Sequence, residues 1–234
     1  MRTARPTRRK CPGWMAGNRI PAAQQSPDEE MPDMRLASRH EIMPRGPSQP
    51  SSPSDRSGPG ARISVQFAHG LEGSPHGRKA RVLAEHFDAF TPGLDTSDFE
   101  ACVRLHGEVL QTRRCDVLVG SSFGGAVAAT LVARGQWTGP TLLLAPAVRR
   151  RGLALWLDPP APLWIVHGEQ DDVVPLEDSV ALERANRKAG ARLIVVEDGH
   201  ALHTSTLSGR LEQWIRELAG LARGRPAARS PGEG

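Results

Sequence analysis

One stretch, Asp-Val-Leu-Val-Gly-Ser-Ser-Phe-Gly-Gly at residues 116–125, constrains the fold of this chain more than any other. Residues 117–119 form a continuous apolar run, which is typical of a strand covered on both faces of a parallel sheet. We expect a helix over residues 123–134. Between them, Gly-x-Ser-x-Gly at 120–124 predicts a sharp strand-to-helix turn with Ser122 at its centre, because side chains at the two glycine positions would collide with neighbouring backbone.

This turn has two interpretations. Ser122 can be an ordinary helix N-cap. Alternatively, the turn is a nucleophile elbow, in which the backbone N–H groups and the dipole of the following helix favour negative charge beside the serine hydroxyl. The second interpretation requires a base and an acid elsewhere in the chain, because a serine hydroxyl is a poor nucleophile on its own.

The hydropathy pattern of the rest of the chain alternates between strands and helices. A helix cap is expected at Ser97 or Asp98, and a helix stop at Gly190. Strands separated by helices predict an α/β fold with a mostly parallel sheet of about six strands and helices on both faces. We expect the strands at 63–68, 87–91, 117–119, 141–145, 163–166 and 192–197, and the helices at 78–86, 99–112, 123–134, 176–189 and 207–221, the last with Leu207, Leu211, Trp214, Ile215, Leu218 and Leu221 on one face.

Composition divides the chain into three parts. Residues 1–60 are rich in Pro, Arg and Ser and contain 10 basic against 6 acidic residues, whereas residues 61–234 contain 20 of each. We expect 1–60 to be a disordered leader, 61–223 to be the folded domain and 224–234 to be a disordered tail. The balanced charge of 61–234 argues against nucleic-acid binding. No apolar run is long enough for a membrane span, and the three cysteines lack metal-ligand spacing, so we expect a cytoplasmic protein without metal or cofactor.

Candidate acid and base residues follow two of the predicted strands. Asp171 lies in the loop after residues 163–166, and its neighbour Asp172 is better explained as a solvated or helix-capping residue. His200 follows the last strand, with His203 as the alternative base. Ligands of parallel sheets bind at the carboxyl ends of the strands. The order Ser122, Asp171, His200 is also that of hydrolases with a nucleophile elbow.

A nucleophilic serine also needs two backbone N–H donors for the negative charge that develops on the attacked carbonyl oxygen. Phe123, the residue after Ser122, is one candidate donor. Leu71 is the other, because Gly70 before it allows the loop after the first strand to bend toward the site. His69 is a candidate substrate-binding residue that braces this loop by hydrogen bonds, or it is simply a partly buried histidine at a strand end.

Taken together, these motifs resemble the α/β-hydrolase superfamily, and most closely the small capless bacterial esterases of the YqiA type. The resemblance covers 61–223 and rests on His69-Gly70 with Gly-Ser-Pro-His-Gly-Arg-Lys-Ala at 73–80, on the 120–125 motif, on His-Gly-x-x-Asp-x-Val-Val-Pro at 167–175 and on Gly199-His200. It implies a reduced α/β-hydrolase fold without a cap domain, with Ser122 as nucleophile, Asp171 as acid and His200 as base.

The expected substrate is a small or medium acyl ester or thioester. The connection after residues 141–145 lies at the carboxyl end of the sheet, where Leu153 and Trp156 either wall an acyl pocket or belong to a segment packed on the core. We therefore expect a serine carboxylesterase or thioesterase that acts through an acyl-enzyme. The alternatives are an acyltransferase with the same three residues and a non-catalytic binding protein on the same fold.

Overall fold

The computed structural model describes residues 62–223. The predicted leader at 1–60 and tail at 224–234 lie outside the described residues. Six strands form one sheet in the order β2-β1-β3-β4-β5-β6, and every neighbouring pair is parallel, as predicted. The strands are β1 (Ser64–Ala68), β2 (Asp88–Phe90), β3 (Val117–Ser121), β4 (Thr141–Leu144), β5 (Leu163–Gly168) and β6 (Arg192–Val196).

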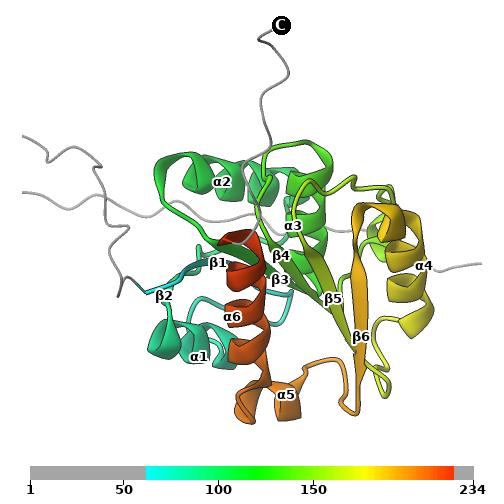
Figure 1. Ribbon diagram of the computed structural model, residues 1–234. Helices are drawn as coiled ribbons and strands as arrows, with labels where there is room; N and C mark the ends of the chain where they lie inside the picture. The colour runs from blue at the N-terminus through cyan, green and yellow to red at the C-terminus, as the bar shows by residue number, and fades with distance from the viewer. Residues whose placement is uncertain (1–61, 224–234) are drawn as a thin grey trace, which may run out of the picture. The chain divides into compact units, whose positions relative to one another are not determined.

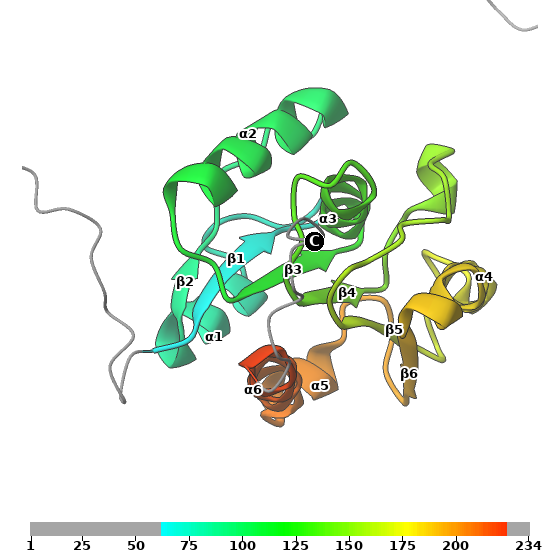
Figure 2. The same cartoon turned by 45° about the horizontal axis from the view of Figure 1, so that its top comes forward.

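Helices cover both faces of the sheet (Figure 1). Figure 2 shows α2 and α3 on the face opposite to α1 and α6. This arrangement is the one expected when each parallel strand is joined to the next by a helical crossover. The helices are α1 (Arg78–His86), α2 (Phe99–Thr112), α3 (Phe123–Ala133), α4 (Leu176–Asn186), α5 (His203–Leu207) and α6 (Arg210–Arg223), with short 3₁₀ helices η1 (Arg149–Arg151) and η2 (Arg187–Ala189).

Two apolar cores lie on the two sides of the sheet. The first packs α1 and α6 against side chains such as Phe67 and Val119, and the second packs α2, α3 and α4 against side chains such as Leu118 and Ile165. Because alternate residues of each strand point to opposite faces, one strand serves both cores. The central strands are therefore buried throughout, which explains why they read as continuous apolar runs.

The predicted caps and most boundaries are confirmed. Asp98 caps α2 by accepting a hydrogen bond from the N–H of Ala101, and Gly190 adopts a left-handed conformation (φ 85°) after η2. Phe87 is the residue after α1 and is buried against the first core, so the second strand is shorter than predicted.

The prediction of one continuous helix over 207–221 is wrong. The segment forms α5 and α6, separated at Gly209, whose φ of 80° is outside the helical region. Leu207 therefore ends α5 and is 66% exposed, and Leu221 near the end of α6 is 49% exposed, so neither shares the buried face of Trp214. Nowhere in residues 62–223 is a helix long and apolar enough to cross a membrane.

Candidate active site

Ser122 occupies the sharp turn between β3 and α3. Its backbone has φ 54° and ψ −113°, a conformation that L-amino acids rarely adopt. Strain of this kind persists only where the surrounding structure fixes it. Here the N–H of Ser122 donates to the carbonyl of Leu144 at 2.8 Å, and its carbonyl accepts from the N–H groups of Ala126 and Ala147 at 3.1 and 3.0 Å.

The glycines around Ser122 allow backbone segments to approach closely. A Cβ atom at Gly124 would overlap the carbonyl of Ala68 and lie 2.6 Å from the carbonyl oxygen of His69. A Cβ at Gly120 would overlap the Gly124 carbonyl. Only glycine fits these positions, because in each case the obstacle is backbone that cannot rotate away. The strand-to-helix turn predicted from the motif is therefore present.

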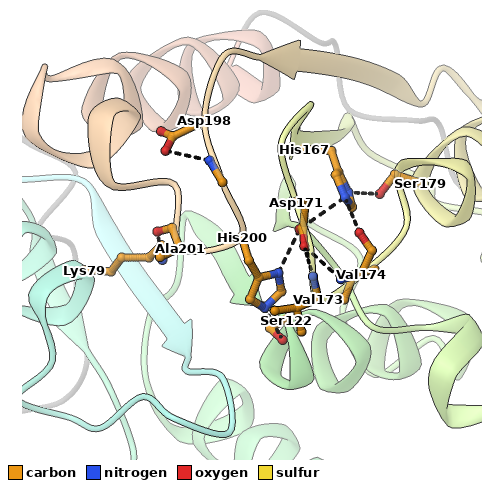
Figure 3. A network of polar contacts seen from close by, with 11 residues as sticks. Lys79, Ser122, His167, Asp171, Val173, Val174, Ser179, Asp198, His200 and Ala201 are labelled. Atoms are coloured by element: carbon orange, nitrogen blue, oxygen red, sulfur yellow. Dashed lines mark hydrogen bonds and ion pairs between the residues drawn. The ribbon is translucent and has the colours of Figure 1, made fainter.

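His200 lies beside Ser122, although 78 residues separate them in the sequence. Its Nε2 atom is 3.0 Å from the Oγ atom of Ser122, and its Nδ1 atom is 2.8 Å from the Oδ2 atom of Asp171 (Figure 3). Since an ionised carboxylate only accepts hydrogen bonds, Nδ1 carries the proton. Nε2 of the neutral ring is then free to accept the Ser122 hydroxyl proton.

Asp171 is held as a buried carboxylate at the end of β5. Its Oδ1 atom accepts hydrogen bonds from the backbone N–H groups of Val173 and Val174 at 2.9 and 2.8 Å. Burial alone raises the pKa of Asp171, but the hydrogen bonds from His200, Val174 and Val173 outweigh burial and hold the pKa below its usual value. Asp171 is therefore ionised at neutral pH, whereas its neighbour Asp172 is exposed.

His167 also contacts Asp171, a contact that the sequence reasoning missed. Its Nε2 atom lies 3.2 Å from Asp171 Oδ2 and 2.9 Å from the carbonyl oxygen of Val174 (Figure 3). Its Nδ1 atom lies 2.7 Å from Ser179 Oγ, so both ring nitrogens of this fully buried histidine have partners. In the sequence, His167 is a polar residue at the end of an apolar strand and the first residue of the motif at 167–175, which does not indicate this contact.

The loop after β1, which carries the predicted donor Leu71, lies against Ser122. The other predicted donor, Phe123, directly follows Ser122 in the chain. A Cβ atom at Gly70 would lie 3.3 Å from the Cβ atom of Ser122. Leu71 follows in this loop with its side chain 57% exposed, and Phe123 is buried as the first residue of α3. His69 Nδ1 donates to the carbonyl of Gly70 at 2.9 Å, consistent with a brace for the loop.

A cavity of about 350 Å³ opens beside Ser122. It is bounded by the loop after β1, the first turn of α1, the elbow and the segment after β6, and His69, Leu71, His200 and His203 are among the residues that line it. His203 begins α5 on the cavity wall, while the contact with Ser122 is made by His200.

The structure corrects the predicted position of the acyl pocket. Leu153 packs against the second core and lines a hollow beside α3, and the Trp156 side chain is 71% exposed. Neither residue lines the cavity at Ser122. The sequence placed their segment at the right edge of the sheet, but it did not show that the segment turns toward α3 and α4, where Asn186 holds it by hydrogen bonds to the N–H of Leu157 and the carbonyl of Leu155.

Lys79 is the second residue of the site that the sequence reasoning passed over. In the sequence it is one residue of the motif at 73–80, with no role assigned to it. The structure places it on α1, where it lines the cavity and its Nζ atom donates to the carbonyl of Ala201 at 2.5 Å (Figure 3). Ala201 directly follows His200, so this bond ties the first helix to the segment that carries the histidine.

Comparison with known proteins supports the architecture. No protein-family model matches the chain, and no curated protein matches it. Among solved structures, a protein from Xanthomonas campestris classed with the hydrolases of the alpha/beta superfamily is 26% identical, with a TM-score of 0.55 over 70% of this chain and 99% of its own.

More distant structures agree on the fold. Est1E from Butyrivibrio proteoclasticus is 17% identical, with a TM-score of 0.54 over 70% of this chain and 91% of its own. An esterase from Pyrococcus furiosus is 15% identical, with a TM-score of 0.53 over 70% and 83%. The parallel six-stranded sheet and these similarities together identify the architecture of residues 62–223 as the α/β-hydrolase fold.

Proposed function

We propose that this protein is a serine hydrolase, a carboxylesterase or thioesterase, that cleaves small to medium acyl esters through an acyl-enzyme. The observation that supports it most directly is the continuous hydrogen-bonded line from Ser122 Oγ through the His200 ring to Asp171 Oδ2, with distances of 3.0 and 2.8 Å. Three residues from separate loops form this line at one edge of the sheet. A plain helix cap at Ser122 requires neither partner.

The chemistry follows from these contacts. Ser122 Oγ attacks the carbonyl carbon of the ester while its proton passes to His200 Nε2. The bond to the leaving oxygen or sulfur then breaks, and Nε2 returns the proton to the departing alcohol or thiol. A water molecule next attacks the acyl-enzyme with the same proton transfers, which releases the acid and restores the Ser122 hydroxyl.

Asp171 has two roles in this proposal. It keeps the proton of neutral His200 on Nδ1, and its negative charge stabilises the imidazolium that forms when Nε2 takes the proton. Both roles need an ionised carboxylate, which the lowered pKa of Asp171 provides at neutral pH.

The N–H groups of Phe123 and Leu71 are the proposed donors to the oxyanion. Phe123 follows the nucleophile at the start of α3, where backbone N–H groups have no helical partner. The packing of Gly70 against Ser122 supports the second donor, since it brings the Leu71 loop to the nucleophile.

Labelling with a fluorophosphonate tests the proposal. We expect the wild-type protein to react once, with the adduct located on Ser122 by mass spectrometry, and to hydrolyse 4-nitrophenyl butyrate. Ser122→Ala should abolish labelling and reduce turnover by about 10⁴-fold or more. Ser208→Ala, a change of an exposed serine outside the cavity, should retain both signals.

Thermal unfolding of all three proteins verifies that they are folded. A folded wild-type protein that neither labels nor turns over ester would favour the non-catalytic alternative. Labelling at a residue other than Ser122 would refute the proposed nucleophile.

A further inference from the structure

Lys79 presents an incompletely satisfied ammonium to the cavity beside Ser122. The group has three N–H bonds, and the hydrogen bond to the Ala201 carbonyl uses one of them. Within residues 62–223, Lys79 forms no salt bridge. Two donors thus remain for a ligand in the cavity that Lys79 lines.

Asp198 is the acidic residue whose charge acts on Lys79, but its carboxylate oxygens accept hydrogen bonds from other groups. Asp198 Oδ1 accepts a hydrogen bond from the Gly199 N–H at 3.1 Å, and Asp198 Oδ2 accepts one from the Ser205 N–H at 2.8 Å. These bonds orient the carboxylate toward its own loop. Asp198 therefore raises the pKa of Lys79 through its charge but forms no salt bridge with it.

Partial burial makes the unpaired charge costly. The pKa of Lys79 is lowered to about 8, mainly by burial and in smaller part by the neighbouring Arg78, while Asp198 raises it. At pH 7 the protonated form still predominates. An anion that enters the cavity would replace the lost hydration of this ammonium, which is the condition under which a charged pair contributes to binding.

The other charged groups of the cavity also favour an anion. Apart from its histidines, the cavity is lined by the basic residues Arg78 and Lys79 and by the acidic residue Glu72. The titratable and charged groups around Lys79 are Arg78 on α1, Glu72 in the loop before it, and Asp198, His200 and His203 in the segment after β6.

We propose that Lys79 determines specificity: the substrate is an ester or thioester whose acyl group carries a carboxylate, and Lys79 binds that carboxylate. The inference rests on the proposed function of Ser122. The acyl group is the part that stays bonded to Ser122 in the acyl-enzyme, so the cavity must hold it. A volume of about 350 Å³ accommodates a short dicarboxylic chain.

Two esters with the same acyl chain length test this proposal. For each enzyme we would measure kcat/KM for 4-nitrophenyl hydrogen adipate and for neutral 4-nitrophenyl hexanoate, and divide the first by the second. Lys79→Met should lower this ratio about tenfold. Lys188→Met is the matched control, because Lys188 is the other lysine of residues 62–223, is exposed and lies outside the cavity, and it should keep the wild-type ratio.

The ratio separates recognition from structural damage. Losing the bond to Ala201 can displace His200, but both esters depend on the same His200, so such damage lowers both rates and leaves their ratio unchanged. Lys79→Arg should retain the preference for adipate. Raising the pH from 7 to 9 should reduce the preference in the wild type, since Lys79 loses its proton near pH 8, but not in Lys79→Arg.

Other outcomes would overturn the proposal. An unchanged ratio in Lys79→Met, with Ser122-dependent hydrolysis of both esters, refutes the role of Lys79 and leaves the proposed function intact. A Lys79-dependent preference for 4-acetoxybenzoate over its methyl ester, but not for adipate, refutes the acyl assignment and places the anion in the leaving group.

Calorimetric titration of Ser122→Ala with monomethyl adipate provides a readout that needs no turnover. Weaker binding after the additional Lys79→Met change supports the anion site even if neither ester is hydrolysed. Absence of binding to Ser122→Ala would refute the anion site, whereas absence of hydrolysis alone would refute only the proposed function.

Discussion

The elbow at 120–125 and the loop that carries Asp171 are both needed at one edge of the sheet, but they are built differently. In the elbow, backbone packing fixes Ser122: glycines permit contacts that any side chain would prevent. In the Asp171 loop, hydrogen bonds fix the carboxylate, two from backbone N–H groups and contacts from His200 and His167. The elbow depends on positions that have no side chain, whereas the Asp171 loop depends on hydrogen-bond donors around the carboxylate.

This difference predicts different responses to substitution. A small added group in the elbow should affect the whole fold, because the sheet and α3 meet there. A change of hydrogen-bonding pattern in the Asp171 loop should affect activity more than folding, because the loop stays the same size.

Among substitutions that compare the elbow with the Asp171 loop, Asp171→Asn is expected to have the largest effect. The amide oxygen can still accept from Val173 and Val174, so the loop should fold, but the amide NH₂ group now faces His200 Nδ1. This favours the tautomer with its proton on Nε2, which cannot accept the Ser122 proton. We expect kcat for 4-nitrophenyl butyrate to fall about 10³- to 10⁴-fold, with the melting temperature changed by only a few degrees.

Asp172→Asn is the matched control, since Asp172 is the exposed neighbour. It should retain activity within about twofold. A large loss of activity in Asp172→Asn, with full activity in Asp171→Asn, would mean that Asp172 and not Asp171 orients His200. The comparison between the elbow and the Asp171 loop would then have no basis.

The next effect is expected in the elbow, from Gly124→Ala. The new methyl group would overlap the Ala68 carbonyl, so β1 and α3 must separate. We expect the free energy of unfolding, measured by urea titration, to fall by about 3 kcal/mol or more. In Gly220→Ala on α6 the new Cβ meets nothing within 4 Å, and this control should gain about 0.5 to 1 kcal/mol.

If Gly124→Ala unfolds at the same urea concentration as the wild type, the turn can relax without separating β1 from α3. The elbow would then tolerate side chains, and its glycines would have to be explained by access to Ser122 alone.

The same contrast explains what could be predicted from the sequence. Features that depend on consecutive residues could be predicted. The alternation of strands and helices, the Asp98 cap and the turn at Ser122 all follow from local sequence patterns. Asp171 and His200 could be paired because parallel strands bring their carboxyl ends to one edge.

Apart from the contacts of His200 with Ser122 and Asp171, features fixed by side-chain contacts between residues far apart in the sequence were not predicted. His167 contacts Ser179, and Lys79 contacts Ala201 across 122 residues. The path of the segment with Leu153 and Trp156 depends on Asn186, a single polar residue in α4. Nothing in the local sequence indicates such partners, because many arrangements of loops would satisfy the same hydropathy pattern.

A third buried polar region shows how the burial of a histidine makes stability depend on pH. His106 on α2 is fully buried, like His167, and its Nδ1 atom lies 2.8 Å from Gln66 Nε2. Its Nε2 atom, however, has no partner among the described residues. Burial, with a smaller contribution from the nearby His69, lowers the pKa of His106 to about 4. The ring therefore stays neutral in the fold at a pH where it would be charged in the unfolded chain.

The sign of the resulting pH dependence is fixed by these values. Below its unfolded pKa of about 6.5 the unfolded chain binds a proton that folded His106 does not, so acid favours unfolding. We expect the free energy of unfolding of the wild type to fall by about 2 to 3 kcal/mol between pH 7 and pH 4 from this residue. His106→Met, measured by urea titration at both values, should lose less stability over the same interval. An equal loss in both proteins would mean that protonated His106 finds a partner in the folded chain, and that its burial does not make stability depend on pH.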